Sequence, residues 1–196
     1  MKLLLISDQI HEALYTYFQK ERWQDVDLIL SAGDLKASYL SFLVTLIEGA
    51  PLYYVRGNHD IYYEKEPPLG CIDIHAKIMD YQGLTILGLE GSRWYNGEGI
   101  QYREWGMKWN VLKLLPKILF KEKIDIILTH APPFGLHDGK HIAHKGFKVY
   151  NYLLDKLQPR YFIHGHVHLS YERQQRIIKY KNTKIINAFQ YHVLEI

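Results

Sequence analysis

The sequence predicts a mixed α/β fold, and two patterns along the chain support this prediction. Short apolar runs of strand length alternate with longer segments of helical pattern, as in domains whose helices cover a β-sheet. Two other stretches each contain a pair of strand-like runs around a tight turn, which adds antiparallel hairpins to the parallel units. A chain of 196 residues that is 47% hydrophobic and 23% charged can bury such a core within one domain.

The elements are expected in the following order. Strands buried on both faces are predicted where apolar residues run without polar alternation, at Lys2–Ser7, Val26–Ser31, Leu52–Val55, Ile124–Thr129 and Tyr161–His164. Helices are predicted at Glu12–Arg22, Ala37–Glu48, Met107–Lys121 and Phe147–Leu157. The hairpins are expected within residues 72–91, around Tyr81-Gln82-Gly83, and within residues 173–189, around Lys181-Asn182.

Composition restricts the compartment and the partners. The N-terminal residues MKLLLISDQ begin basic and then apolar, but the apolar run is too short for a secretory signal and ends at Asp8. No segment approaches membrane-spanning length, so we expect no membrane partner. Cys71 is the only cysteine, which fits a reducing compartment and a cytoplasmic location. The net charge of +3 suits an anionic substrate, and nucleic acid is an open but unsupported alternative.

Polar side chains follow the predicted strands at the points where they end. In chain order these are Asp8, Asp34, Asn58, His59, His130, His166 and His168. Because ligands of open α/β sheets bind outside the carboxyl ends of the strands, we expect these residues to form one site. Taken singly, each has an ordinary explanation: an aspartate can cap a helix, and Gly57-Asn58 suits a turn. The set as a whole is better explained as a group of metal ligands.

This set resembles the signature of the calcineurin-like metallophosphoesterase superfamily. The signature runs D-x-H, G-D, G-N-H-[DE], H and G-H-x-H, and the chain has SDQI (7–10), GD (33–34), GNHD (57–60), THAPP (129–133) and GHVH (165–168). The resemblance implies a single domain over residues 1–196, built as a four-layer αββα sandwich of two mixed β-sheets flanked by helices. It also implies a dinuclear metal-dependent phosphoesterase, in which a metal-bridging hydroxide attacks the phosphorus of a small phosphodiester or phosphomonoester.

The same resemblance assigns ligands to two divalent metal ions. Asp8, Asp34 and His168 would hold the first ion, and Asp34, Asn58, His130 and His166 the second. Mixed imidazole and oxygen ligands favour Mn, with Fe, Zn or Ni as alternatives, over Mg or Ca. Ile10 stands where the family has a histidine, so the first site is expected to be the weaker one. The neighbouring His11 is more simply explained as a residue at the start of a helix.

Two residues beside the ligands would take part in the reaction. By resemblance, His59 donates a proton to the leaving oxygen or stabilises its charge, and Asp60 orients the loop that carries it. Further candidates for contact with the substrate or for support of the ligands are Arg56, Arg93, His137, Asp138 and His144. Each could equally be an ordinary surface or loop residue. His164 could support a ligand or simply be a strand residue.

Several alternatives remain at this stage. Ala37 and Ser38 occupy the positions of the Asp-Arg pair that protein Ser/Thr phosphatases carry, which argues against that branch. The absence of the family histidine at Ile10 leaves room for a catalytically weak or inactive metal-binding scaffold. A nuclease is the other alternative, although a chain of this length offers no separate domain to clamp DNA. The sequence does not determine the oligomeric state.

Overall fold

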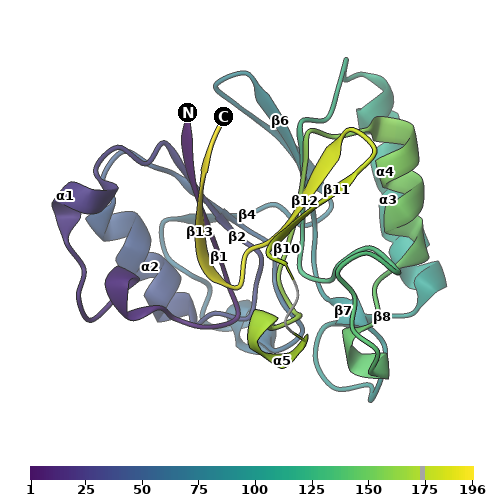
Figure 1. Cartoon of the computed structure of the whole chain (residues 1–196), viewed down its shortest axis with the longest axis horizontal. Coiled ribbons are helices and arrows are strands. Elements are labelled where there is room, and N and C mark those ends of the chain that lie inside the picture. The colour runs from purple at the N-terminus through teal and green to yellow at the C-terminus, as the bar shows by residue number, and fades with distance from the viewer. Residues whose placement is uncertain (173–174) are drawn as a thin grey trace.

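The computed structural model describes residues 1–172 and 175–196, and most of its strands form two sheets that lie face to face (Figure 1). The first sheet has the order β13-β1-β2-β3-β4. Its strands are β1 (Lys2–Ser7), β2 (Leu28–Ser31), β3 (Leu52–Tyr54), β4 (Cys71–Asp73) and β13 (Gln190–Glu195). Neighbouring strands are parallel except for β13, which runs antiparallel to β1.

The second sheet has the order β11-β12-β10-β9-β6-β5. Its strands are β5 (Lys77–Tyr81), β6 (Leu84–Leu89), β9 (Ile126–Thr129), β10 (Tyr161–His164), β11 (Ile177–Tyr180) and β12 (Thr183–Asn187). The four central strands are parallel, and an antiparallel hairpin strand closes each edge. A short parallel pair, β7 (Ser92–Arg93) and β8 (Gln101–Tyr102), lies apart from both sheets.

Helices cover the outer faces of the two sheets (Figure 1). The first sheet carries α1 (Lys20–Trp23) and α2 (Ala37–Leu46), and the second carries α3 (Glu104–Leu119) and α4 (Lys148–Leu157). Short 3₁₀ helices occur at Glu12–Leu14, Asp60–Glu64 and Ile142–His144, and α5 is Leu169–Glu172. The predicted four-layer αββα sandwich is confirmed. No helix within the described residues is long and apolar enough to cross a membrane.

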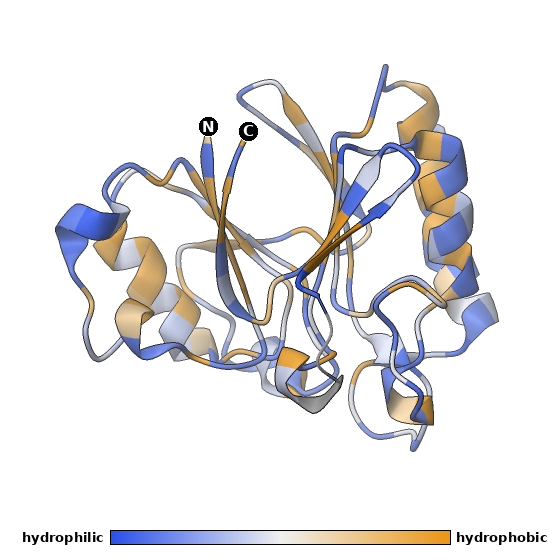
Figure 2. Ribbon diagram, viewed as in Figure 1, coloured by the Kyte–Doolittle hydropathy of each residue, from blue (hydrophilic) through white to orange (hydrophobic). Residues whose placement is uncertain are grey.

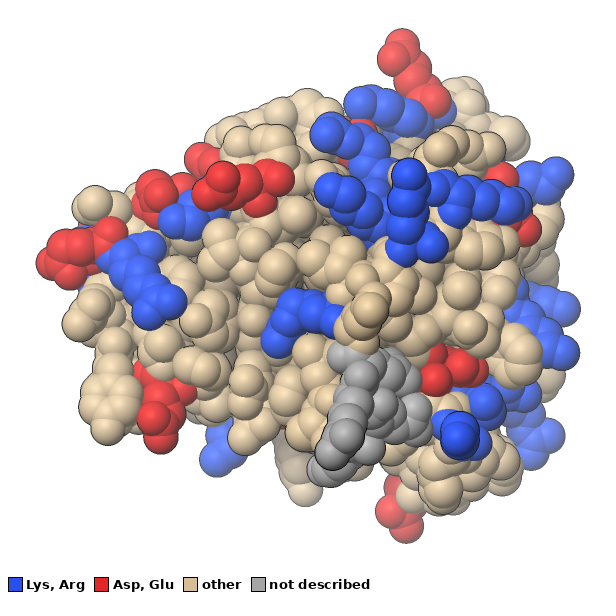
Figure 3. Space-filling view, viewed as in Figure 1, with Lys and Arg blue, Asp and Glu red and all other residues tan. Residues whose placement is uncertain are grey.

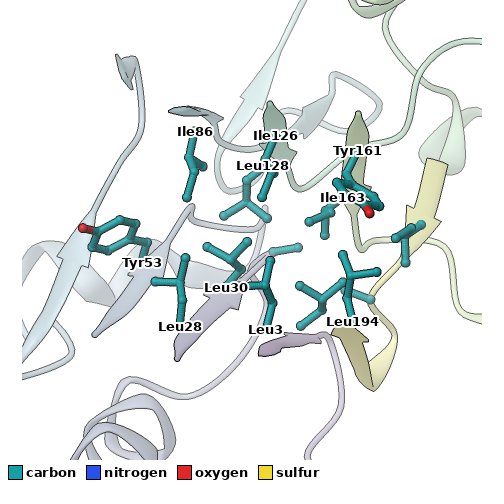
Figure 4. Close-up of a cluster of buried hydrophobic side chains, with 14 of the residues drawn as sticks. Leu3, Leu28, Leu30, Tyr53, Ile86, Ile126, Leu128, Tyr161, Ile163 and Leu194 are labelled. Carbon is teal, nitrogen blue, oxygen red and sulfur yellow. The ribbon is translucent and has the colours of Figure 1, made fainter. Parts of the chain in front are cut away.

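The strands are apolar on both faces because each face meets a different core. Successive side chains of a strand point to opposite sides, so Leu3 and Leu5 face the second sheet while Leu4 and Ile6 face α2. In Figure 4, Leu28 and Leu30 meet Ile126 and Leu128 between the sheets. Figure 2 shows apolar residues along the central strands and both apolar and polar residues along the helices. The core between the sheets and the two cores beneath the helices together hold the carboxyl ends of both sheets in place.

The predicted element positions are largely confirmed. The strands at Lys2–Ser7 and Tyr161–His164 match, while β2, β3 and β9 are shorter than expected by one or two residues. Both hairpins turn where predicted: β5 and β6 meet across Gln82-Gly83, and β11 and β12 across Lys181-Asn182. The start of the second predicted hairpin, residues 173–174, lies outside the described residues.

The helix predicted at Glu12–Arg22 is wrong. A 3₁₀ turn ends at Leu14, the chain leaves helical geometry at Tyr15 (φ −140°, ψ −82°), and α1 begins only at Lys20. The intervening run of β-branched and aromatic side chains has low helix propensity. Leu14 and Trp23 are the buried residues of this segment, so its packing relies on two anchors rather than on a helical face.

Candidate metal centre

The candidate ligands lie where parallel strands of both sheets end. Asp8 follows β1, Asp34 follows β2 and Asn58 follows β3, while His130 follows β9 and His166 follows β10. Three of these residues adopt left-handed backbone conformations, with φ of 64° at Asp8, 56° at Asp34 and 67° at His166. Such conformations are uncommon outside glycine and concentrate at functional sites. The chain therefore turns sharply at each of these positions and directs the side chain toward a common point.

Glycines make the close approach of these loops possible. A Cβ added to Gly57 would lie 2.0 Å from Oδ1 of Asp34, and one added to Gly165 would lie 2.6 Å from Oδ2 of Asp8. Neither distance is compatible with a real side chain, so the loops from β3 and β10 contact the carboxylates only because these positions lack a Cβ. The close packing of these loops thus explains why glycine precedes both Asn58 and His166.

The centre of the site is a compact group of donor atoms. Ligand atoms of Asp34, His130 and His166 all lie within 4.8 Å of one another. Nε2 of His130 is 3.3 Å from Oδ2 of Asp34, 3.1 Å from Oδ1 of Asn58 and 3.1 Å from Nδ1 of His166. Both imidazoles are buried, as is the amide. A carboxylate, an amide oxygen and two imidazoles therefore converge at one point.

Hydrogen bonds behind the rings fix which nitrogen faces the centre. Nδ1 of His130 donates to the Ala32 carbonyl at 2.7 Å, and Nε2 of His166 donates to the Ala143 carbonyl at 2.6 Å. In the neutral rings, the lone pairs then lie on Nε2 of His130 and on Nδ1 of His166, which face each other. The Asn58 amide nitrogen donates to the Tyr95 hydroxyl at 3.3 Å, so its oxygen also points inward. A proton on Nε2 of His130 or a bound cation can lie between these atoms, and the mixed nitrogen and oxygen donors fit a divalent transition metal.

Asp8 and His168 form a second group beside the first. Nε2 of His168 is 3.9 Å from Oδ1 of Asp8, and the Asp8 carboxylate accepts the backbone N–H of His166 at 3.0 Å. Ile10 takes no part, because it packs partly buried against the core between α2 and the first sheet. His11 accepts the Ala13 N–H at 3.1 Å and so begins the 3₁₀ helix, in agreement with its simpler interpretation. This second group therefore offers fewer donors than the first.

The electrostatics of the centre favour a positive charge. Burial lowers the pKa of His130, but the Asp34 and Asp8 carboxylates outweigh this effect and raise the pKa to about 9. Burial raises the pKa of Asp8 to about 7. Burial also acts to raise the pKa of Asp34, but the His130 imidazole reverses the direction and lowers it. The two carboxylates thus hold negative potential that a cation at the centre would neutralise.

His59 and Asp60 follow Asn58 and have different environments. His59 is exposed, and its backbone N–H donates to Oδ1 of Asp34 at 2.8 Å. Asp60 is buried, and its Oδ2 accepts the N–H groups of Asp34 and Gly57, both at 2.7 Å. Burial and the nearby Asp34 charge raise the pKa of Asp60 to about 6. Asp60 therefore joins the loops after β2 and β3, whereas the His59 ring is free to meet a ligand.

Two adjoining cavities open at this centre. One has a volume of about 340 Å³ and is lined by Asp8, Asp34, Asn58, His59, Tyr95, Ala143, His144, His166 and His168. The other, of about 430 Å³, is lined by Asp34 and His59 together with Lys36, Ser38, Tyr62, Tyr63, Glu66 and their neighbours. His59 thus stands at the junction between the space beside the ligands and a second space beyond it.

The remaining candidates from the sequence lie in different places. His144 lines the first cavity, and its ring packs 5.5 Å from that of His166. Arg56 instead forms a bidentate pair with the buried Glu90, at 2.7 and 3.2 Å. Arg93 lies in β7, and neither arginine lines the two cavities as the described residues define them.

The last two candidates hold the loop after β9 rather than facing the cavities. Nδ1 of His137 lies 3.0 Å from Nε2 of His164, and both rings are buried. Asp138 accepts the Gly146 N–H at 3.3 Å. The contact between the two rings therefore anchors this loop to β10.

Some functional contacts were not anticipated from the sequence. The Ala32 and Ala143 carbonyls orient the two histidine rings, and main-chain atoms carry no signal in the residue pattern. Glu90 is different, because a carboxylate directly after an apolar strand is visible in the sequence and could have been noticed. It is 2% exposed and also accepts the Tyr102 hydroxyl at 2.7 Å. Its pairing with Arg56 joins the end of β6 to the loop that bears Asn58.

Comparisons with known proteins agree with this architecture. A family model described as "Calcineurin-like phosphoesterase" matches residues 1–170. The chain is 29% identical over 107 residues to "Metallophosphoesterase domain-containing protein 1" of Homo sapiens and of Mus musculus, a match that covers 52% of this chain. It spans only 30% of the length of those relatives.

Solved structures share the fold at low sequence identity. One superimposes with a TM-score of 0.70 at 17% identity and covers 98% of this chain and 94% of its own. The structure of TT1561 from Thermus thermophilus has a TM-score of 0.66 at 16% identity, with 96% and 88% covered. At these identities the likeness concerns the arrangement of the two sheets and their helices.

Proposed function

Because the chain belongs to the calcineurin-like phosphoesterase family, we propose that it is a metal-dependent hydrolase of small phosphate esters. The observation that carries the proposal is the convergence of potential ligand atoms from Asp34, Asn58, His130 and His166 at the ends of the strands. Carboxylate, amide and imidazole groups gathered at one point are the donor types that divalent transition metals take in proteins. This donor set supports metal binding at the ends of the strands as the role of these loops.

The proposed centre holds two divalent ions that share Asp34. The ligands of the fuller site are Asp34, Asn58, His130 and His166, and those of the other site are Asp8, Asp34 and His168. When bound, such ions would supply a water of lowered pKa and positive charge for the phosphoryl oxygens. The mixed nitrogen and oxygen donors support Mn, with Fe, Zn or Ni as alternatives. Because Ile10 contributes no donor, we expect the site formed by Asp8, Asp34 and His168 to bind its ion more weakly.

The other residues of the cavity bind the substrate and handle its leaving group. His59 stands between the two cavities, so it can donate a proton to an ester oxygen whose phosphoryl group lies beside the ligands. The leaving group would then occupy the cavity of about 430 Å³, a size that suits a small organic group. Asp60 orients the His59 loop through its hydrogen bonds to the Asp34 and Gly57 N–H groups.

The test is hydrolysis of bis-p-nitrophenyl phosphate and of p-nitrophenyl phosphate after loading with Mn²⁺. We expect metal-dependent turnover that Asp34→Asn and His166→Ala abolish together with bound metal, measured by elemental analysis. His11→Ala is the matched control, because His11 begins a 3₁₀ helix outside the centre. Unchanged activity in Asp34→Asn would refute the assignment. Absence of turnover with both esters in protein that holds metal would instead favour a binding scaffold.

The proposed role of His59 requires a separate measurement. His59→Ala should lower turnover about 10²-fold or more, since general acid catalysis contributes at least that much. Metal content should stay near that of the parent protein, because only the His59 backbone contacts Asp34. Loss of metal along with turnover would mean that the side chain is a ligand.

A further inference from the structure

Helix α3 is apolar on two opposite faces. Met107, Val111 and Leu114 enter the core against the second sheet. At 100° per residue the opposite face carries four large apolar side chains, and Phe120 follows directly at the end of the helix. We call this set the outer face of α3. Its exposed fractions are 73% for Trp105, 58% for Trp109, 50% for Leu112, 83% for Leu119 and 90% for Phe120. A contiguous exposed apolar surface of this kind usually marks an interaction site.

A groove continues the outer face toward α4. It has a volume of about 400 Å³ and is lined by Lys108, Val111, Leu112, Leu115, Lys148, Val149 and Tyr152. The lining is mainly aliphatic and aromatic, with a lysine contributed by each helix. The surface is thus a protruding helix with an apolar groove beside it rather than an isolated exposed residue.

Lysines surround this surface without carboxylate partners. Lys108, Lys113, Lys117, Lys148 and Lys156 form no ion pair with any residue that the structure describes. Glu104 is the only acidic residue of α3, and its carboxylate accepts the Lys148 and Val149 N–H groups. Figure 3 shows Lys and Arg side chains gathered on the side of the molecule that carries α4 and the β11–β12 hairpin. The lysines within α3 and α4 therefore complement an anionic occupant.

The distribution of charge also argues against a second copy of the chain. Two outer faces in contact would bring together the lysines of both α3 helices, which outnumber the single acidic residue of each helix, and unpaired like charges oppose association. The large apolar side chains project outward from a convex helix, and Trp, Phe and Leu flanked by Lys are typical of helices that lie in a membrane interface. Lys113 lies 6.0 Å above the Trp109 ring, so apolar and basic groups are presented together.

We propose that the outer face of α3 and the groove beside it bind the surface of an anionic lipid membrane. Trp105, Trp109, Leu119 and Phe120 insert among the acyl chains, and the surrounding lysines contact the headgroup phosphates. This association is peripheral and requires no spanning segment. It therefore departs from the expectation of no membrane partner, which rested only on the absence of such a segment. None of the residues of the outer face lines the two cavities at the candidate metal centre.

The test is sedimentation of the full chain with vesicles of phosphatidylcholine and phosphatidylglycerol, compared with vesicles of phosphatidylcholine alone. We expect binding to the anionic vesicles that weakens at high salt, because screening reduces the attraction between lysines and headgroups. Trp105→Ser combined with Trp109→Ser should abolish it, and each of Lys108→Gln, Lys113→Gln and Lys117→Gln should weaken it about fivefold. Tyr17→Ser combined with Leu69→Ser is the matched control, since these side chains are 67% and 74% exposed elsewhere.

Further measurements distinguish membrane binding from contact with a second copy of the chain. Circular dichroism melts should coincide for all variants, because the substituted side chains are exposed. Absence of binding by the parent chain, or equal binding by the tryptophan variant, would overturn the proposal. So would a dimer of the parent chain in light scattering that the tryptophan variant converts to a monomer, because a second copy would then cover the face. Vesicle binding is measured without substrate, so its outcome is independent of the proposed hydrolase activity.

Discussion

At the scale of single residues, the candidate centre depends on neighbours that orient its ligands. The Ala32 and Ala143 carbonyls orient the rings of His130 and His166, and the Tyr95 hydroxyl orients the Asn58 amide so that its oxygen faces inward. Ligands held in this way need little reorganisation when a cation binds. The affinity of the centre should therefore respond to residues that never contact the metal.

Tyr95→Phe provides a direct check of this dependence. The change removes the hydroxyl that lies 3.3 Å from the Asn58 amide nitrogen and keeps the ring that lines the cavity. We expect Mn²⁺ affinity to fall about tenfold, the lower end of the effects seen for groups that orient metal ligands. Isothermal titration calorimetry measures the affinity, with Tyr17→Phe on the surface as control. An affinity equal to that of the parent would show that Asn58 needs no such support.

The buried pair His137 and His164 should make stability depend on pH. Burial lowers the pKa of His137 to about 4 and that of His164 well below its ordinary value. An unfolded histidine has a pKa near 6.5, so between about pH 6.5 and 4 the unfolded chain binds more protons than the folded one. The stabilisation is complete above about pH 6.5 and declines as the pH falls, by up to about 1.4 kcal/mol per pH unit for each ring.

His137→Gln isolates one of these two contributions. Glutamine can still hydrogen-bond the His164 ring but does not titrate, so the variant should lose less unfolding free energy than the parent between about pH 6.5 and 5. Urea unfolding at a series of pH values gives the two curves. Parallel curves over that interval would mean that the His137 ring is protonated in the folded protein as readily as in the unfolded one.

At the scale of elements, each ligand loop depends on a small number of backbone positions. The strands fix where a loop begins, and the glycine before a ligand allows two loops to touch. Gly57 illustrates this, because its missing Cβ leaves room for the Asp34 carboxylate. The spacing within the GNHD segment is thus a steric requirement as well as a chemical one.

Gly57→Ala should therefore disrupt the centre. The new Cβ would lie 2.0 Å from Oδ1 and 2.4 Å from Cγ of Asp34, so the carboxylate or the loop must shift. We expect Mn²⁺ binding to weaken by at least about tenfold, since ligand geometry would be lost. Gly106→Ala in α3 is the control: its Cβ would meet nothing nearer than 3.7 Å, and the helix should gain about 0.5–1 kcal/mol. Undiminished metal binding in Gly57→Ala would contradict the steric argument.

The elements also show what the sequence can and cannot predict. Buried parallel strands are recognisable because both faces are apolar, as in Lys2–Ser7, and the Gln82-Gly83 turn has its own chemistry. The strand β13 was not predicted, because Gln190–Glu195 mixes polar and apolar residues at a sheet edge. The helix expected at Glu12–Arg22 failed because its apolar residues anchor a loop instead.

For the candidate site, the sequence predicts the cluster of ligands but not the partners of the loop side chains. The strand-end residues predict a cluster, since parallel strands end at one edge of a sheet, and the structure brings Asp34, His130 and His166 together. Which partner a loop side chain chooses depends on distant segments. Arg56 pairs with Glu90, 34 residues away, and His137 with His164, 27 residues away. Contacts of this length are not encoded in local spacing.

At the scale of the whole molecule, the core between the sheets is shared by the two ends of the chain. Leu3 and Leu5 of β1 lie in the same cluster as Ile186, Ala188 and Leu194 near the C-terminus. The strand β13 pairs with β1 along its full length, and β12 pairs with β10 beside the ligand loop. The family model ends at residue 170, yet residues beyond it close an edge of each sheet.

A chain ending at residue 170 should therefore fail to fold cooperatively. It would lose the burial of Ile185, Ile186 and Leu194, at about 1.5–3 kcal/mol for each side chain, which is comparable with the whole stability of a typical domain. It would also leave β1 and β10 as unpaired edges, which favours aggregation. Thermal melts followed by circular dichroism should show no sharp transition, whereas removal of Ile196 alone should preserve one. A cooperative melt and retained Mn²⁺ binding in the shortened chain would mean that the first 170 residues hold the centre without the C-terminal strands.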